Sequence, residues 1–230
     1  MKQHQEKRWG PWLVGLCSIF LIALAGIAGW NYWRNIQEEK DQLTQLQILQ
    51  IIAQHPGEYT MATVPPMTDV IFYPVEKQKE YSDTFVYAEV IGEKGYFNRS
   101  ITMGEPELDA KLSSQGMGTF RYFEIPIQVI RDTEGRYQEG DRLTIWANCM
   151  FEETDPQMRP GTEIIVPVSD SQEQGEPSTR KSYGTTGFYY VTEDGYAIAA
   201  FDEAQAPSTL TRSGYTSGLK VDALLRRLKK

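Results

Sequence analysis

A long apolar run near the N-terminus limits most strongly what this chain can fold into. Residues 13–29 carry no charge, and aromatic residues extend the run on both sides: Trp12, Trp30, Tyr32 and Trp33. The whole span is about 20 residues long, which as a helix crosses a hydrocarbon core of roughly 30 Å. Tryptophans that flank such a run are typical of the two membrane–water interfaces. The sequence therefore predicts one transmembrane helix over residues 12–33, with the lipid bilayer as its partner.

A cleaved signal peptide is the alternative to this anchor. The basic start of the chain and the triplet Ala23-Leu24-Ala25 both fit a secretory signal with a small-residue cleavage site. The apolar run continues beyond the triplet and ends in aromatic residues, which favours an uncleaved anchor. Basic residues outnumber acidic residues before the span. After the span, the basic residues Arg34 and Lys40 lie among three acidic residues. We therefore expect residues 1–11 to be a cytoplasmic tail, and the main domain to be extracytoplasmic at the cell membrane.

The segment that follows the span, residues 34–55, has the composition of a helix. It holds no Gly or Pro from Asn35 to Gln54, and its apolar residues recur at three- and seven-residue steps. The run His55-Pro56-Gly57 predicts its end. The sequence thus predicts a helical stalk that continues the transmembrane helix. Two fates stay open for its apolar stripe: packing on the chain's own domain, or a short coiled coil with a second copy.

Residues 56–230 have the pattern of a mainly β domain. Short β-branched and aromatic runs alternate with turn signals, over residues 70–73, 84–91, 120–130, 142–149, 164–168, 188–191 and 196–201. Asp194-Gly195 predicts a tight hairpin between the last two runs, and Pro126 predicts an edge position or a bulge. About six or seven such strands are enough for a small closed β-barrel. We expect its core to hold Phe85, Val90, Ile125, Ile127, Val129, Leu143, Ile145, Ile165, Val191 and Ile198.

The end of the chain predicts an amphipathic helix. Apolar residues recur there at i, i+3, i+4 and i+7, at Val221, Leu224, Leu225 and Leu228, with cations around them. Packing on the barrel is the commoner fate of such a helix, and binding to anionic lipid is the alternative.

Charge is distributed unevenly along the chain. Residues 1–33 hold three cations and one acid, and residues 211–230 hold six cations and one acid. The formal net charge of −8 therefore leaves −15 on residues 34–210. An acidic body repels phosphate backbones, so we expect no nucleic-acid partner.

Several sequence motifs of the predicted β domain follow one another in a defined order along the chain. A strand over Ser82–Val90 is followed by Gly140-Asp141 ahead of a second strand, and Gly161 then precedes an apolar run. Gly187 begins a further strand, and Leu219–Lys230 closes the series as a helix. This order resembles uncharacterised membrane-anchored extracytoplasmic proteins of Gram-positive bacteria with a small OB-like β-barrel domain. The resemblance covers roughly residues 70–230 and implies an OB-like barrel in the cell envelope, with no established catalytic residues.

Residue counts restrict the chemistry of the domain. The chain has two histidines, His4 and His55, and two cysteines, Cys17 and Cys149. Only His55 and Cys149 lie outside the predicted tail and span, which is too few for a zinc site. His55 fits a solvated helix end, and Cys149 fits a small buried apolar residue at a strand end. We therefore expect no catalytic residue, no metal site and no cofactor.

Two groups of residues are candidates for a binding or catalytic surface. The first group is aromatic and would face a ligand: Tyr183, Tyr190 and Trp146. Core packing is the alternative for such tyrosines. The second group is an acidic cluster after a strand, which an ordinary solvated turn would also explain: Glu152, Glu153 and Asp155.

These features predict a single-pass membrane-anchored cell-envelope protein. Its extracytoplasmic domain would be a non-catalytic interaction domain, with an envelope protein or a glycan as partner. The alternative is a small envelope hydrolase that uses paired carboxylates on a glycan substrate.

Overall fold

The computed structural model describes residues 11–61, 79–80, 82–100, 104–115, 118–149, 152, 155–170, 180–183, 187–201 and 216–229. The predicted strand at residues 70–73 lies outside these ranges. The chain divides into two compact units, Met1–Asp41 and Gln42–Lys230.

The first unit contains helix α1, Pro11–Asp41, which includes the predicted span at residues 12–33. Large apolar side chains of this helix are exposed from Phe20 to Trp33. Within the described ranges, no helix is both long enough and apolar enough to span a membrane. The structure thus gives the transmembrane assignment no support, and it stays a prediction from the sequence.

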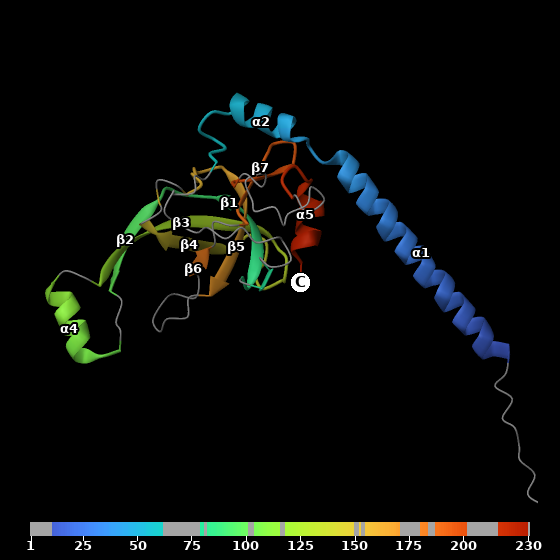
Figure 1. The fold of residues 1–230 in the computed structure, drawn as a ribbon, viewed down its shortest axis with the longest axis horizontal. Helices are drawn as coiled ribbons and strands as arrows, with labels where there is room; N and C mark the ends of the chain where they lie inside the picture. The colour runs from blue at the N-terminus through green and yellow to red at the C-terminus, as the bar shows by residue number, and fades with distance from the viewer. Residues whose placement is uncertain are drawn as a thin grey trace, which may run out of the picture. The chain divides into compact units, whose positions relative to one another are not determined.

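The second unit is built on a closed five-stranded barrel (Figure 1). Around the barrel lie β1 (Thr84–Val90), β3 (Thr119–Asp132), β4 (Arg142–Asn148), β6 (Arg180–Tyr183) and β5 (Glu163–Asp170). Strand β5 pairs with β1 and closes the ring. Strands β4 and β6 run parallel, and the other neighbours in the ring are antiparallel. The prediction of a mainly β fold with a small barrel is confirmed.

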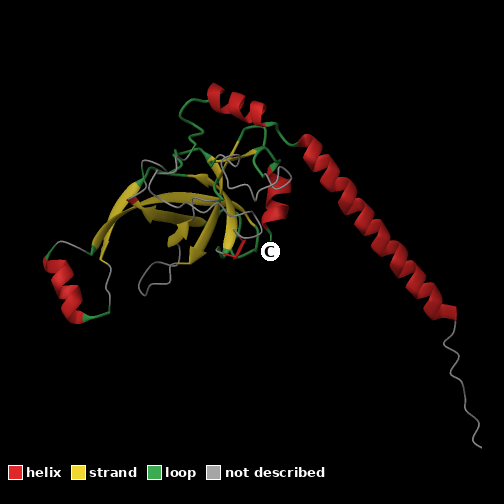
Figure 2. Ribbon diagram, in the orientation of Figure 1, coloured by secondary structure: helices red, strands yellow, loops and turns green. Residues whose placement is uncertain are grey.

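Further elements extend this barrel (Figure 2). Strand β2 (Gly95–Ser100) pairs with the first half of β3, and helix α4 (Pro106–Ser114) lies in the connection between them. Strand β7 (Tyr189–Val191) pairs with β5, and β8 (Ala197–Ala199) pairs with β7. The predicted hairpin turn at Asp194-Gly195 joins these last two strands, with Gly195 at φ 72°. Two helices complete the unit, α2 (Gln45–Gln54) and α5 (Val221–Leu228).

All ten predicted core residues are buried, and nine of them divide between two layers, while the tenth, Ile198, is buried on β8. The barrel interior holds Val90, Ile125, Ile127, Val129, Leu143 and Ile145. Phe85, Ile165 and Val191 instead face outward into a second apolar layer between the barrel and α5. The prediction that these three are core residues is confirmed. Phe85 and Ile165 fall in the second layer because they alternate along β1 and β5 with residues of the barrel interior, and both strands are buried on both faces over most of their length.

Helix α5 packs on the outside of the barrel. Its predicted apolar face is buried, with Leu224 and Leu228 at 0% exposure, and it contacts Phe85, Ile165 and Tyr189 within the second layer. The prediction that this helix packs on the domain is confirmed.

The predicted stalk over residues 34–55 is not one continuous helix. Helix α1 ends at Asp41, and α2 begins after Thr44, whose hydroxyl accepts from the backbone N–H of Gln47 while the Gln47 side chain accepts from the Thr44 N–H. This capping box starts a new helix. Ile48 is buried, and Ile51 and Ile52 pack against the barrel core. Residues 42–54 therefore belong to the domain, and its predicted start at residue 56 is too late.

Pro126 lies neither on an edge strand nor in a bulge. It pairs with Thr144 of β4 on one side, and on the other side its carbonyl accepts from Ile91, just after β1 ends. Strand β2 begins only at Gly95, opposite Glu124. Pro126 therefore lies where the partner of β3 changes from β1 to β2. No N–H donor is needed from β3 at this position, so proline breaks no backbone hydrogen bond of the sheet.

Candidate functional site

Three aromatic rings gather on one face of the sheet formed by β2, β3 and β4. The Phe97 and Tyr122 rings are stacked with centroids 5.5 Å apart, and the Trp146 ring meets both nearly edge-on at 6.2 and 5.1 Å. Strand register brings them together, because Phe97 lies opposite Tyr122 and Trp146 lies opposite Glu124, two residues along β3. We call Phe97, Tyr122, Trp146 and Arg99 the aromatic face.

Arg99 completes this face with a cation. Its guanidinium carbon lies 5.2 Å from the centroid of the Trp146 ring, within the range of a cation–π contact. The Trp146 indole nitrogen is buried and has no hydrogen-bond partner among the described residues. An unpaired buried donor lowers stability.

A second group, the Glu152 cluster, lies on the opposite face of the same strands. The Glu152 carboxylate accepts a 2.6 Å hydrogen bond from the Tyr96 hydroxyl and a 3.0 Å hydrogen bond from the Lys94 ammonium. Lys94 also lies 4.7 Å from the centroid of the buried Phe123 ring. Tyr96 and Phe97 are successive strand residues, so the two groups face opposite ways.

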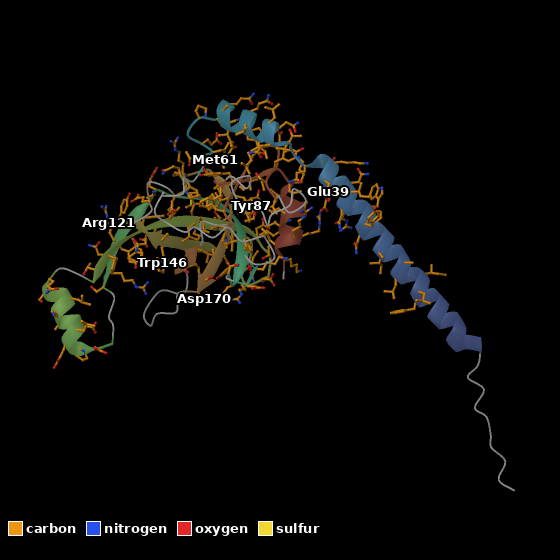
Figure 3. All side chains as sticks on the ribbon, viewed as in Figure 1. Glu39, Met61, Tyr87, Arg121, Trp146 and Asp170 are labelled. Atoms are coloured by element: carbon orange, nitrogen blue, oxygen red, sulfur yellow. The ribbon has the colours of Figure 1, made fainter. Side chains whose placement is uncertain are left out.

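Arg121 extends the Glu152 cluster. Its guanidinium carbon lies 4.2 Å from the centroid of the Tyr96 ring. Figure 3 shows Arg121 and Trp146 on the part of the sheet that carries β2, β3 and β4. Cations thus lie beside aromatic rings on both faces of this sheet, in a domain whose overall charge is strongly negative.

The hydrogen bonds of the cluster decide the charge on Glu152. Burial by itself would raise the pKa of this carboxyl, but the bonds from Tyr96 and Lys94 outweigh it and the pKa lies below its usual value. Burial raises the pKa of the neighbouring Cys149 thiol, and the Glu152 carboxylate adds to that rise. At neutral pH Glu152 is therefore an ionised acceptor, and Cys149 is a protonated thiol that packs against the core.

These properties suit binding better than acid–base chemistry. A glycosidase needs one carboxyl with a raised pKa as general acid, whereas the pKa of Glu152 is lowered. The His55 ring lies at the end of α2, where its Nδ1 is 3.0 Å from a Glu58 carboxylate oxygen. In the part of the chain that the structure describes, no three His, Cys, Asp or Glu side chains are grouped to hold a metal ion.

The predicted acidic cluster is only partly described. Glu152 is bound to Tyr96 and Lys94, Asp155 is half-buried, and Glu153 lies outside the described residues. Trp146 does not flank Glu152, because it belongs to the aromatic face on the other side of the sheet. The aromatic ring beside Glu152 is that of Tyr96, on a strand that the sequence interpretation missed.

The two predicted tyrosines do not join the aromatic face. Tyr190 is fully buried, and its hydroxyl donates to the Gln157 carbonyl at 2.8 Å and lies 3.0 Å from the Thr60 hydroxyl. Burial raises its pKa to about 12. Tyr190 is thus a core residue, which was the stated alternative to a ligand-facing position. Tyr183 ends β6, and its side chain lies outside the described residues.

A separate charged network links the ends of β5 and β6. The buried Lys181 ammonium donates to the Asp170 carboxylate, and Arg136 lies 3.6 Å from Asp83 and 3.9 Å from Asp170. Asp132 accepts from the Thr84 hydroxyl and from backbone N–H groups of the turn that follows β3. These contacts hold the strand ends and that turn in place, which is a structural role.

An open hollow of about 450 Å³ lies beside β1 and β3. Its lining consists of Glu89, Gln128, Val129, Ile130, Glu139 and Gly140. It contains neither an aromatic ring nor a cation, so the aromatic face and the Glu152 cluster are the better candidate surface.

Comparison of the sequence with protein-family models finds no match, and comparison with curated protein sequences finds none either.

Proposed function

We propose that this chain is a single-pass membrane-anchored cell-envelope protein whose barrel is a non-catalytic extracytoplasmic interaction domain. The observation that carries the proposal is the surface on β2, β3 and β4, where aromatic rings and cations lie together on both faces. Arginines and aromatic side chains are enriched in the binding centres of protein interfaces.

The barrel architecture supports the same reading. A small five-stranded barrel is the architecture of the OB-fold, which binds ligands on strands at one side of the barrel and on the loops beside them. Here the candidate surface lies on β3, on β4 and on β2, which pairs with the first half of β3. An OB-like fold and a relationship to Gram-positive envelope proteins are parts of this proposal.

The membrane anchor rests on the first unit of the chain. The uncharged run at residues 13–29 is flanked by tryptophans, and α1 leaves Phe20, Ile22 and Ile27 more than half exposed to solvent. A continuous exposed apolar surface of this kind needs a covering phase, which a bilayer would supply.

Site-specific photocrosslinking in intact cells tests the interaction. Tyr96 is exposed, so replacing it with a benzophenone amino acid places the probe on the face of the sheet that carries the Glu152 cluster. We expect covalent adducts with an envelope component from this position. The same probe at Glu193, on the exposed turn between β7 and β8, is the control and should give none. Equal adducts from both positions would argue against a dedicated surface.

Protease treatment of the same cells tests the topology. External protease should remove the domain and leave a short membrane stub. A domain that is protected until the cells are lysed would contradict the proposed orientation.

A further inference from the structure

Among the strands that the structure describes, none pairs with the second edge of β2. Among the described elements it pairs with β3 alone, and its residues alternate between exposed and half-buried positions. By contrast, the edge of β8 is covered, because Ala197 exchanges backbone hydrogen bonds with Gly218 and Leu219. An open edge presents a row of backbone donors and acceptors that another chain can pair with.

The hydrogen bonds of β3 show which groups of β2 point outward. Pro126 accepts from Ile91 on the β1 side, whereas Val129 donates to Asp141 on the β4 side. Even-numbered residues of this part of β3 therefore bond toward β1 and β2, and odd-numbered residues bond toward β4. Glu124 and Tyr122 are even, so their partners Gly95 and Phe97 use their backbone groups on β3.

The backbone N–H and C=O groups of Tyr96 and Asn98 must then point away from β3. Within the described part of the chain these groups have no hydrogen-bond partner. These groups can form backbone hydrogen bonds with an added strand, and they lie at the centre of the six-residue strand β2.

We propose that the open edge of β2 binds an extended segment of a partner protein by strand addition, and that this segment alternates acidic and apolar residues. The proposal rests on the interaction function proposed above. Backbone hydrogen bonds give affinity in this mode of recognition, and alternate side chains give specificity.

The two faces beside the edge determine that alternation. On the Tyr96 side the exposed Arg121 lies opposite Asn98 in register, and its guanidinium is over the Tyr96 ring. Acidic side chains of the added strand would meet this cation. On the other side the half-buried Phe97 ring begins the aromatic face, and apolar side chains would extend that cluster.

A labelled peptide tests the proposal on the full-length chain in detergent solution. The probe is a capped hexapeptide of alternating Glu and Val with a fluorescein label, and anisotropy measures its binding. We expect saturable binding, a loss of at least about tenfold for a peptide with Lys in place of Glu, and a similar loss for Arg121→Gln, where tenfold corresponds to about 1.4 kcal/mol.

Position 98 provides a matched pair of variants. Asn98→Pro removes one outward N–H and places a ring at the edge, which edge strands tolerate. Asn98→Ala changes the side chain and keeps the N–H. We expect a loss of at least about tenfold for the proline variant and less than about threefold for the alanine variant. If Asn98→Pro fails to fold, a peptide N-methylated at alternate residues takes its place and should bind at least about tenfold more weakly.

Three results would overturn the proposal. They are equal binding of the Glu and Lys peptides, equal binding by the two Asn98 variants, and a concentration-dependent dimer of the chain that Asn98→Pro abolishes. The last result would identify a second copy as the occupant. If Asn98→Pro leaves the cellular adducts from position 96 intact, the interaction function stands and strand addition is wrong.

Discussion

The backbone N–H of Leu43 donates a 2.9 Å hydrogen bond to the carbonyl of Gly218, which joins the segment before α2 to the segment before α5. The Gln42 side chain donates to the Ser217 carbonyl beside it at 2.8 Å. Gly218 adopts φ 85°, and a Cβ there would lie 2.9 Å from the Leu43 carbonyl oxygen. Only glycine fits both this conformation and this close approach.

Gly218→Ala should therefore lower the free energy of unfolding by about 2–5 kcal/mol, as the sum of left-handed strain and overpacking. Gly161→Ala is the matched control, because Gly161 has φ 86° but no heavy atom within 4 Å of its Cβ position. Gly161→Ala should lower the free energy of unfolding by only about 1–2 kcal/mol. Urea denaturation of both variants measures the difference, and equal losses would show that the Leu43 contact is unimportant.

The barrel interior predicts a large effect at Ile145, which is fully buried within the core cluster. Ile145→Ala should lower the free energy of unfolding by about 2–5 kcal/mol, because it removes buried methyl groups and leaves a cavity. Leu46 on α2 is 66% exposed, so Leu46→Ala should change the free energy of unfolding by less than about 0.5 kcal/mol. Comparable losses for the two variants would contradict the strand phase described here.

Tyr190 predicts a specific loss from a single hydroxyl. Tyr190→Phe keeps the ring but leaves the half-buried Gln157 carbonyl without its 2.8 Å donor. The free energy of unfolding should fall by about 1–3 kcal/mol. Binding of the Glu-Val peptide should be unchanged, since the Tyr190 hydroxyl bonds to Thr60 and Gln157 and its ring packs beside Tyr59 and Phe188, outside β2. A fall in peptide binding without a fall in stability would restore Tyr190 as a ligand-facing residue.

Glu152 predicts a pH effect on stability. Its folded-state pKa is lowered, so its contribution is present above the unfolded-state pKa of about 4.3 and is lost as the pH falls toward the folded-state value. Glu152→Gln should therefore be less stable than the natural chain at pH 7, and the gap should narrow as the pH falls below about 4.3. Thermal melting from pH 7 to pH 3 measures this gap, and a constant gap would contradict the assignment.

The sequence predicted those elements whose pattern is strong and continuous. Strands β1, β3, β4, β5, β7 and β8 follow from β-branched and aromatic runs, and α5 follows from its apolar face. Strand β2 was missed because Gly95–Ser100 is short and half polar, and an edge strand buries too little to need an apolar run. Strand β6 and helix α4 were missed for a similar reason, since both lie in segments with the composition of loops.

The candidate site was harder to predict than the fold. Trp146 was singled out as ligand-facing, which stays a prediction; its neighbours Phe97 and Tyr122 are 49 and 24 residues away in the chain, and strand register alone brings the three rings together. Glu152 was also singled out, yet its partners Lys94 and Tyr96 come from the missed strand and the turn before it. Alternation along Tyr96, Phe97, Asn98 and Arg99 was the one available signal. It could have indicated a strand, but not which rings would meet.

The bond between Leu43 and Gly218 has a consequence for how the domain folds. It pairs residues 175 positions apart, as does the neighbouring bond of Gln42 with Ser217. The segment before helix α2 therefore lacks these hydrogen-bond partners until residues 217–218 have been synthesised. Contacts of such long sequence separation slow folding, because the loop must close before the contact stabilises it. We expect the domain to acquire its native structure only after residues 217–218 have been made, with α2 among the last elements to become ordered.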